Sequence, residues 1–357
     1  EALFKFTGAC LGHRKGGVAM AAIGACAGFG AICGSSLATA ATMGKVALPE
    51  LRKLGYSGAL STGTLAAGGT LGILIPPSVI LIIYSILTEQ NIAKMFLAAF
   101  IPGILAALGY IITIAIYVRF VKDSGPTRSR INWKERLILF KNIWQIILIF
   151  ITMIGGIYLG WFTPTEGGAI GAIGTGLLAF LNKNFKFKDL IDVIESTAVT
   201  TAMIFLVLLG AEFFNSFIAL TQLPNELGRI ALSNNLSPLL IVACILILYL
   251  FLGCLMDSLA MILLTIPVFF PLIMTLDFGM TPEETAIWFG ILTLIVVEVG
   301  LITPPVGLNV FIINKMAGDI KISETFKGVF PFLISDVLRV VLLFSFPSIT
   351  LFLLKVF

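Results

Sequence analysis

Two short polar breaks interrupt apolar segments of this chain, and a double proline follows each break about forty residues later. The breaks are 34–36 (Gly-Ser-Ser) and 256–258 (Met-Asp-Ser), and the double prolines are 76–77 and 304–305. Proline removes a backbone donor and clashes with the preceding turn, so a helix is interrupted there. Broken helices in matching places of two halves indicate a substrate and ion site in a secondary transporter.

The composition excludes a soluble protein. Of the 357 residues, 58% are hydrophobic and 12% are charged, about half the charged fraction of a soluble domain. The sequence therefore predicts an all-α polytopic membrane protein in a lipid bilayer. The net charge of +4 is no sign of nucleic-acid binding, because the basic residues lie in loops beside apolar runs. The single histidine and five scattered cysteines have no metal-ligand spacing, and we expect no disulfide.

The apolar runs beside the two polar breaks are too short to cross a membrane. A crossing needs about 20 residues, so we predict a re-entrant helical hairpin at 18–47 and another at 239–275. Non-helical backbone at membrane depth persists only where protein or water satisfies it, so the hairpin tips should be buried in a site. The double-proline runs, 59–88 and 285–314, are predicted to be transmembrane helices broken near the middle.

The distribution of basic residues predicts the orientation. Segment 119–142 is strongly basic and should be cytoplasmic. Counting outward with seven crossings and two hairpins puts 19 of the 23 Lys and Arg on the cytoplasmic side. The hairpins then open to opposite sides, so the two halves are inverted repeats. Ser36-Leu37-Ala38 and Pro49 match Ser258-Leu259-Ala260 and Pro271 at one constant offset, which agrees with a repeat.

These patterns predict four parts. They are a cytoplasmic amphipathic connector at 1–17 that follows missing N-terminal helices; a first repeat at 18–118 that ends in a helix at 95–118; a basic cytoplasmic loop with connecting scaffold helices at 119–236; and a second repeat at 237–357 that ends in a final helix at 325–355.

The chemistry of the breaks suits a small cation and an organic anion. A half-helix that ends inside the membrane leaves free carbonyls at one end and free N–H groups at the other. Carbonyl ends bind cations and N–H ends bind anions. Ser35, Ser36, Asp257 and Ser258 add side-chain oxygens suited to a hard cation such as Na⁺. The alternative is that serine and glycine here only pack helices closely.

Five ionisable residues lie within apolar runs, where each charge is costly. Asp336 and Arg339 are three residues apart, so we expect them to neutralise each other on one helix. Asp257 lies at a break and is predicted to bind an ion. Glu298 has three open roles: it binds a cation, carries a proton or pairs with a distant base. For Glu212, packing or a lipid boundary is at least as good an interpretation as transport.

Four segments together resemble the large membrane subunit of tripartite ATP-independent periplasmic (TRAP) transporters, in the ion transporter superfamily. They are 30–39 (GAICGSSLAT), 69–78 (GTLGILIPPS), 252–258 (LGCLMDS) and 298–309 (EVGLITPPVGLN). The resemblance implies a Na⁺-driven elevator-type importer of organic-acid anions in the bacterial inner membrane. It also implies a small four-helix membrane subunit and a soluble periplasmic substrate-binding protein. Among the substrates of such transporters we favour sialic acid, with C4-dicarboxylates next.

The resemblance also implies site residues, including two Na⁺ sites. The first comprises Ser35, Ser36, Gly72 and Pro76, and the second Asp257, Ser258, Gly300 and Thr303. The predicted substrate contacts are Ser35, Ser36, Pro76, Ser78, Pro305, Gly307 and Asn309. The hairpins and broken helices are expected to move as a block against the helices at 95–118, 143–181 and 325–355.

Other functions fit parts of the sequence. A stand-alone dicarboxylate/Na⁺ symporter would share the fold and need no binding protein. An intramembrane serine hydrolase would use Ser35 or Ser36 with Lys45 as the base, because His13 lies in a cytoplasmic loop. A passive scaffold subunit of a respiratory complex is a third alternative, but this chain lacks the run of mid-membrane lysines that proton-pumping subunits need. We expect a transporter and no enzyme.

Overall fold

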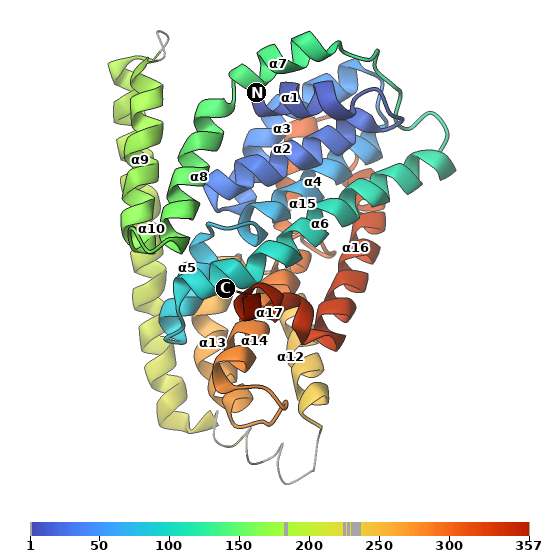
Figure 1. Cartoon of the computed structure of the whole chain (residues 1–357). Helices are drawn as coiled ribbons and strands as arrows, with labels where there is room; N and C mark the ends of the chain where they lie inside the picture. The colour runs from blue at the N-terminus through green and yellow to red at the C-terminus, as the bar shows by residue number, and fades with distance from the viewer. Residues whose placement is uncertain (1, 182–184, 224–225, 227–228, 230–236, 357) are drawn as a thin grey trace.

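The computed structural model describes residues 2–181, 185–223, 226, 229 and 237–356, and in these residues it contains α-helices and no strand (Figure 1). The first part of the chain forms six helices: α1 (Ala2–Leu11), α2 (Gly17–Cys33), α3 (Ser36–Lys53), α4 (Gly58–Leu74), α5 (Val79–Leu87) and α6 (Ile92–Phe120). The connecting part forms α7 (Trp133–Lys141), α8 (Trp144–Tyr158), α9 (Pro164–Leu181) and α10 (Phe187–Thr221). The last part forms α12 (Pro238–Gly253), α13 (Ser258–Met274), α14 (Pro282–Gly300), α15 (Leu308–Ala317), α16 (Ile322–Ser345) and α17 (Pro347–Val356).

Many of these helices begin at a polar residue that caps the first turn. Such a side chain accepts a hydrogen bond from a backbone N–H group that has no partner within the helix. Ser35 does this for α3, Ser78 for α5 and Asp257 for α13, where the acceptor is the carboxylate. Each of these caps lies inside an otherwise apolar stretch, so the same residue ends one apolar segment and starts the next helix.

The first halves of the two broken helices form the centre of the molecule. Every residue of α4 from Leu60 to Leu74 is buried, and so is every residue of α14 from Thr285 to Gly300. Both helices are rich in small residues, which lets neighbouring backbones approach closely. A Cβ atom placed on Gly63 of α4 would lie 2.4 Å from the carbonyl carbon of Gly328 in α16. The helices α3, α2 and α16 pack closely around α4.

The connecting helices α8, α9 and α10 lie at one side of the molecule (Figure 1). Gly167 is the only buried residue of α9, and Ala211 and Ile218 are the only ones of α10. Three residues of α8 (Met153, Ile154 and Ile157) form a small apolar cluster of their own, separate from the main core. Helices α9 and α10 therefore leave most of their apolar side chains exposed or half-buried.

Three helices are long and apolar enough to cross a membrane, namely α6, α10 and α16, when the described residues are judged by length and composition. The number rises to five if each of two bent pairs counts as one crossing. The pair α4 and α5 bends by 44° at the first double proline, and the pair α7 and α8 bends by 57°. The fold is thus an all-helical one that fits a polytopic membrane protein, and the expected seven crossings stay a prediction.

One sequence-based boundary is wrong. The final helix predicted at 325–355 is two helices, because α16 ends at Ser345 and Pro347 starts α17. A proline at the first position of a new helix needs no N–H partner. The basic loop at 119–142 also contains a helix of its own, α7, which runs across the top of the molecule in Figure 1.

Candidate functional site

The tip of the first hairpin is a two-residue turn between α2 and α3. Gly34 adopts a left-handed conformation (φ 64°) and donates its N–H to the carbonyl of Gly30. Ser35 then caps α3 by accepting the N–H of Ala38 at 3.4 Å. Because only glycine adopts this φ without strain, Gly34 allows the chain to reverse here and places two serine hydroxyls at the tip.

This tip packs against the first broken helix with no room for additional side-chain atoms. A Cβ atom on Gly72 of α4 would lie 2.6 Å from the carbonyl oxygen of Ser35. A Cβ atom on Gly30 would lie 2.5 Å from the Cα atom of Gly72. The predicted residues Ser35, Gly72 and their neighbours Pro76 and Ser78 therefore lie at one place, where α3 and α5 begin and α4 ends.

The second hairpin and the second broken helix meet in the same manner. The turn between α12 and α13 ends at Asp257, whose carboxylate accepts the N–H of Leu259 at 3.1 Å. A Cβ atom on Gly300, at the end of α14, would lie 2.6 Å from the Cα atom of Gly253 at the end of α12. The N–H of Gly307 donates to the carbonyl of Cys254 at 3.4 Å. The break at 301–307 is thus held against the hairpin through backbone atoms.

Hydrogen bonds connect the two places. The hydroxyl of Ser36, in the first hairpin, donates to the Oε2 atom of Glu298, in the second broken helix. The Ser258 side chain of the second hairpin also interacts with this carboxylate. The side-chain amide of Asn309 donates to the carbonyl of Ala66 in α4 at 3.3 Å. Residues from both hairpins and both broken helices therefore belong to one connected polar cluster inside the molecule.

Three oxygen atoms in this cluster are buried and have no hydrogen-bond partner among the described residues. They are the Oε1 atom of Glu298, the Oδ1 atom of Asn309 and the Oγ1 atom of Thr39. A buried polar atom without a partner is costly. Oxygen atoms of this kind are the ligands that hard cations prefer, so the donor set fits Na⁺. The residues described contain no group of three or more His, Cys, Asp or Glu side chains that could hold a metal, so a cation here would depend on hydroxyl, amide and backbone oxygens as well.

Most predicted site residues meet in these two places. Ser35, Ser36, Gly72, Pro76 and Ser78 lie at the first, and Asp257, Ser258, Gly300, Thr303, Pro305 and Gly307 lie at the second. Asn309 is buried and lies between them, beside Gly69 of α4. At the second place, the side chains of Thr303 and Pro305 differ in whether a protein group already occupies them. The hydroxyl of Thr303 donates to the carbonyl of Val299 at 2.6 Å, whereas Pro305 is exposed.

Glu298 is the residue whose place the sequence did not predict. It is fully buried, and its partner Ser36 is 262 positions away in the chain. Of its three open roles, pairing with a base is the one that the geometry does not support, because Glu298 makes no ion pair in the described part of the chain. The signal in the sequence was its charge within an apolar run, which marked it without naming its partner.

The remaining charged residues of the apolar runs are either paired with each other or exposed. Arg339 donates to the Oδ1 atom of Asp336 at 2.7 Å, which confirms the predicted pair. Tyr110 of α6 donates to the other carboxylate oxygen at 2.8 Å, and its hydroxyl lies 3.0 Å from that of Thr70 in α4. Glu212 is exposed on α10, away from the cluster.

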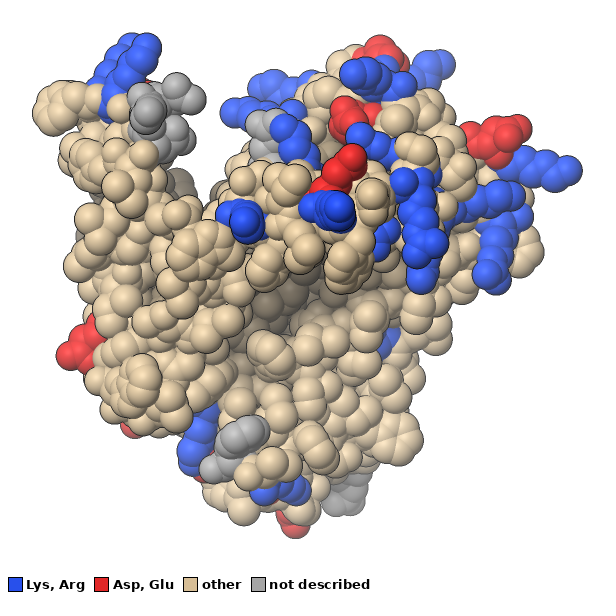
Figure 2. Space-filling view, turned by 45° about the horizontal axis from the view of Figure 1, so that its top comes forward, with Lys and Arg blue, Asp and Glu red and all other residues tan. Residues whose placement is uncertain are grey.

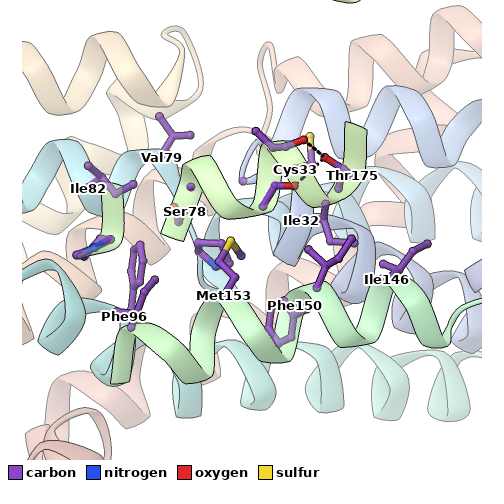
Figure 3. Close-up of a pocket in the computed structure, with 18 residues that line it drawn as sticks. Ile32, Cys33, Ser78, Val79, Ile82, Phe96, Ile146, Phe150, Met153 and Thr175 are labelled. Carbon is purple, nitrogen blue, oxygen red and sulfur yellow. Dashed lines mark hydrogen bonds between the residues drawn. The ribbon is translucent and has the colours of Figure 1, made fainter. Parts of the chain in front are cut away.

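A cavity of about 330 Å³ separates the first hairpin tip from the connecting helices. Ile32, Cys33 and Val79 line it from the first hairpin and the first break, and Phe150, Met153 and Thr175 line it from the connecting helices. The second group belongs to α8 and α9. Figure 3 shows Phe150 and Met153 on one helix and Thr175 beside Cys33. The lining is mostly apolar.

Comparisons with known proteins give the family. A model of the family described as "Tripartite ATP-independent periplasmic transporter, DctM component" matches residues 1–349. This chain belongs to that family. It is 33% identical to the C4-dicarboxylate TRAP transporter large permease protein DctM of Pseudomonas aeruginosa, over 98% of this chain and 80% of the relative.

Relatives with other named substrates are similarly close. The chain is 33% identical to the sialic acid TRAP transporter permease protein SiaT of Haemophilus influenzae, over 99% of this chain and 56% of the relative. It is 30% identical to the sialic acid TRAP transporter large permease protein SiaM of Vibrio cholerae, over its whole length and 82% of the relative. The protein is therefore a TRAP transporter membrane subunit and not an enzyme. In accord with this, the Ser36 hydroxyl contacts Glu298, and Lys45 is exposed further along α3.

Proposed function

We propose that this subunit imports organic-acid anions coupled to Na⁺. The observation that carries the proposal is the buried cluster in which Ser36 of the first hairpin contacts Glu298 of the second broken helix. A cation bound at this cluster would touch both halves of the chain at once. Sialic acid and C4-dicarboxylates are the substrates to test, because relatives named for each are about equally similar to the chain.

The ends of the half-helices suit both ligands. The N-termini of α3 and α5 lie at the first place and those of α13 and α15 at the second. Helix N-termini attract anions through their N–H groups and their dipole, so the substrate carboxylate belongs there. The carbonyl ends of α4 and α14 attract cations for the opposite reason. We assign the first Na⁺ to Ser35, Ser36, Gly72 and Pro76, and the second to Asp257, Ser258, Gly300 and Thr303.

The carboxylates of the site support two monovalent cations. Asp336 is neutralised by Arg339. Asp257 and Glu298 have no ion-pair partner in the described part of the chain, and Asp257 lies close enough to Glu298 to act on it electrostatically. Two uncompensated carboxylates near the centre of a bilayer are unfavourable. Two Na⁺ ions would neutralise them and let the site cross the membrane without a bare charge. When bound, Na⁺ supplies this neutralisation, and the gradient of Na⁺ drives import.

We infer an elevator mechanism in which both halves move together as inverted repeats. Thr70, Tyr110 and Asp336 form one hydrogen-bonded chain across α4, α6 and α16. The backbones of Gly63 and Gly328 are in contact. A moving block that left α6 and α16 behind would have to break these contacts. We therefore place α6 and α16 within the moving block, in contrast to the sequence-based assignment of 95–118 and 325–355 to the static part.

The part that stays still is then the group of connecting helices α8, α9 and α10. Its apolar cluster is separate from the main core, and the cavity of Figure 3 lies along its border. One polar contact between α10 and the second hairpin is a long hydrogen bond of 3.4 Å from Asn215 to the carbonyl of Leu263. Apolar surfaces without ion pairs slide past each other at low cost, which is what such a motion needs.

The expected partners follow from the exposed faces and from the family. A small four-helix membrane subunit and a soluble periplasmic binding protein would complete the transporter in the bacterial inner membrane. The apolar faces of α9 and α10 offer a large surface to a membrane subunit or to lipid. Figure 2 shows Lys and Arg gathered at one end of the molecule, which we assign to the cytoplasm.

The proposal is tested by uptake in proteoliposomes. The protein is reconstituted with its small membrane subunit, and substrate uptake is followed with a panel of purified binding proteins and an inward Na⁺ gradient. We expect uptake of one organic-acid anion only when Na⁺ and one binding protein are both present. Uptake that ignores the Na⁺ gradient would contradict ion coupling, and uptake without any binding protein would indicate a stand-alone symporter.

A further inference from the structure

A second cavity, of about 520 Å³, is lined by none of the predicted site residues. Helix α1, helix α3 and the segment before α7 surround it. Its charged lining residues are Lys5, Lys45, Glu50, Lys53 and Arg128. Lys5 has an interaction of its own. The other three cations face one carboxylate, so the cavity carries an excess of positive charge.

This positive charge is only weakly compensated. The Nη1 atom of Arg128 lies 3.9 Å from the Oε1 atom of Glu50, and both side chains are well exposed. Lys45 and Lys53 are exposed and make no ion pair within the residues described. The opposite end of the molecule differs, because Lys94 and Lys355 there are paired with glutamates at 2.6 Å and 3.3 Å.

The cavity is held in shape by the backbone. The N–H of Arg128 donates to the carbonyl of Gly12, just after α1, at 2.9 Å. The ring of Phe140 in α7 packs against Phe6 in α1 with centroids 5.8 Å apart. Arg128 is therefore fixed over the cavity by contacts that do not involve its guanidinium, which stays available to an anion.

The remaining lining of the cavity is apolar and leads to α7. Phe4, Val18, Val46, Ile131 and Leu139 supply this part. Helix α7 has no buried residue. It exposes a group of large apolar side chains next to basic ones, namely Trp133, Leu137, Ile138 and Phe140 beside Lys134, Arg136 and Lys141. Helix α7 therefore presents both apolar and basic side chains beside the cavity.

We propose that this cavity binds the headgroup of an anionic phospholipid. The phosphate would lie among Lys45, Lys53 and Arg128, and the acyl chains would follow the apolar side of α7. Basic pockets between membrane helices on the cytoplasmic side recognise such headgroups. A free anion such as phosphate would use the cations but would leave the apolar lining in contact with water, so the mixed lining favours a lipid.

The test compares two triple variants with the same change of charge. The first, Lys45→Gln, Lys53→Gln and Arg128→Gln, removes the cations of the cavity. The control, Lys15→Gln, Arg119→Gln and Lys122→Gln, removes three cations from a separate hollow at the same end. Each protein is purified in detergent with phosphatidylglycerol, and the lipid that remains bound is counted by native mass spectrometry.

We expect the control to retain one phosphatidylglycerol as the unchanged protein does. The first variant should bind it roughly 100-fold more weakly, at about fivefold for each cation removed. A single Lys53→Glu variant, at an exposed position, serves if the triple variant does not fold, and it should also weaken binding. Equal retention by both triple variants would overturn the proposal. So would equal retention of phosphatidylcholine, or release of the lipid by millimolar inorganic phosphate, which would indicate a free-anion site.

Discussion

The core of hairpins and broken helices differs from the connecting helices in how its small residues are used. In the core, Gly63 and Gly328 bring two backbones into contact, and a Cβ atom on Gly328 would lie 1.8 Å from the carbonyl oxygen of Ala59. In the connecting helices, a Cβ atom on Gly176 of α9 or Gly210 of α10 would meet nothing within 4 Å. The core is therefore held by backbone contacts between helices, whereas these two glycines of the connecting helices face open space.

The largest expected difference in stability is between two ion pairs of the same spacing, one buried and one exposed. Asp336 and Arg339 are buried, whereas Glu226 and Arg229 are a pair of the same i,i+3 spacing that is half or more exposed. We expect Asp336→Ala to destabilise the protein by about 3–5 kcal/mol, because it leaves Arg339 uncompensated. Glu226→Ala should change stability by less than about 1 kcal/mol. Thermal unfolding in detergent measures both, and equal losses would refute the distinction.

A glycine pair tests the packing directly. We expect Gly328→Ala to lower stability by about 1–3 kcal/mol or more, because the added methyl overlaps the backbone of Ala59. The matched change Gly176→Ala should leave stability unchanged or raise it by up to about 1 kcal/mol, since alanine is the better helix former. The readout is again thermal unfolding. Comparable destabilisation by both substitutions would mean that α9 packs against a neighbour more closely than the structure indicates.

Removal of the Ser36 hydroxyl tests the link between the two halves. Ser36→Ala takes away the hydrogen bond to Glu298 and leaves the helix intact. We expect the half-saturating Na⁺ concentration for uptake to rise about tenfold or more, which corresponds to about 1.4 kcal/mol. Thr200→Ala in α10, whose hydroxyl bonds only to its own helix, is the control and should transport normally. An unchanged Na⁺ dependence for Ser36→Ala would refute the assignment.

The smallest difference is expected at two helix ends that have the same cap. The backbone N–H of Thr281 and that of Thr163 each donate to a glutamate three residues later, Glu284 in the core and Glu166 in α9. These hydrogen bonds hold the pKa of both carboxyls below the ordinary value of about 4.5. A lowered pKa in the folded state stabilises the protein above pH 4.5 and is lost as the pH falls through the folded value.

We therefore expect Glu284→Gln to cost about 0.5 kcal/mol at pH 7 and nothing in strong acid. Glu166→Gln should act in the same direction with the same pH dependence, because both carboxylates accept the same kind of backbone hydrogen bond. Unfolding temperatures measured between pH 3 and pH 7 check this. A difference from the unchanged protein that persists at pH 3 would mean that the carboxylate charge is not the cause.

Much of the core could be predicted because local chemistry decides it. The polar breaks and double prolines each end a helix for a local reason, and the predicted hairpin at 18–47 contains α2 and most of α3. The pairing of Asp336 with Arg339 followed from helical spacing. The break before α17 had a local signal too, in Pro347, which the long apolar run concealed.

Other features could not be predicted from local patterns. The contact between Ser36 and Glu298 joins positions 262 residues apart, so no periodicity reports it. The placement of α6 and α16 within the core depends on two contacts of the packed structure. Gly328 of α16 touches the backbone of α4, and Tyr110 of α6 donates to Asp336 of α16. Crossings assigned by hydropathy alone do not show which helices move together.

Which helices move together is measured most directly with two crosslinks. Cys33 in the first hairpin and a Thr175→Cys change in α9 line the same cavity (Figure 3). Gly109→Cys in α6 and Ser335→Cys in α16 form the second pair, because a Cβ atom on Gly109 would lie 2.8 Å from the Oγ atom of Ser335. Each pair is bridged by a bifunctional maleimide in a background without the other cysteines, and Na⁺-driven uptake is measured. We predict that the bridge from Cys33 to position 175 stops transport, whereas the bridge from 109 to 335 leaves it largely intact. Transport that continues with the first bridge, or that stops with the second, would contradict a single moving core.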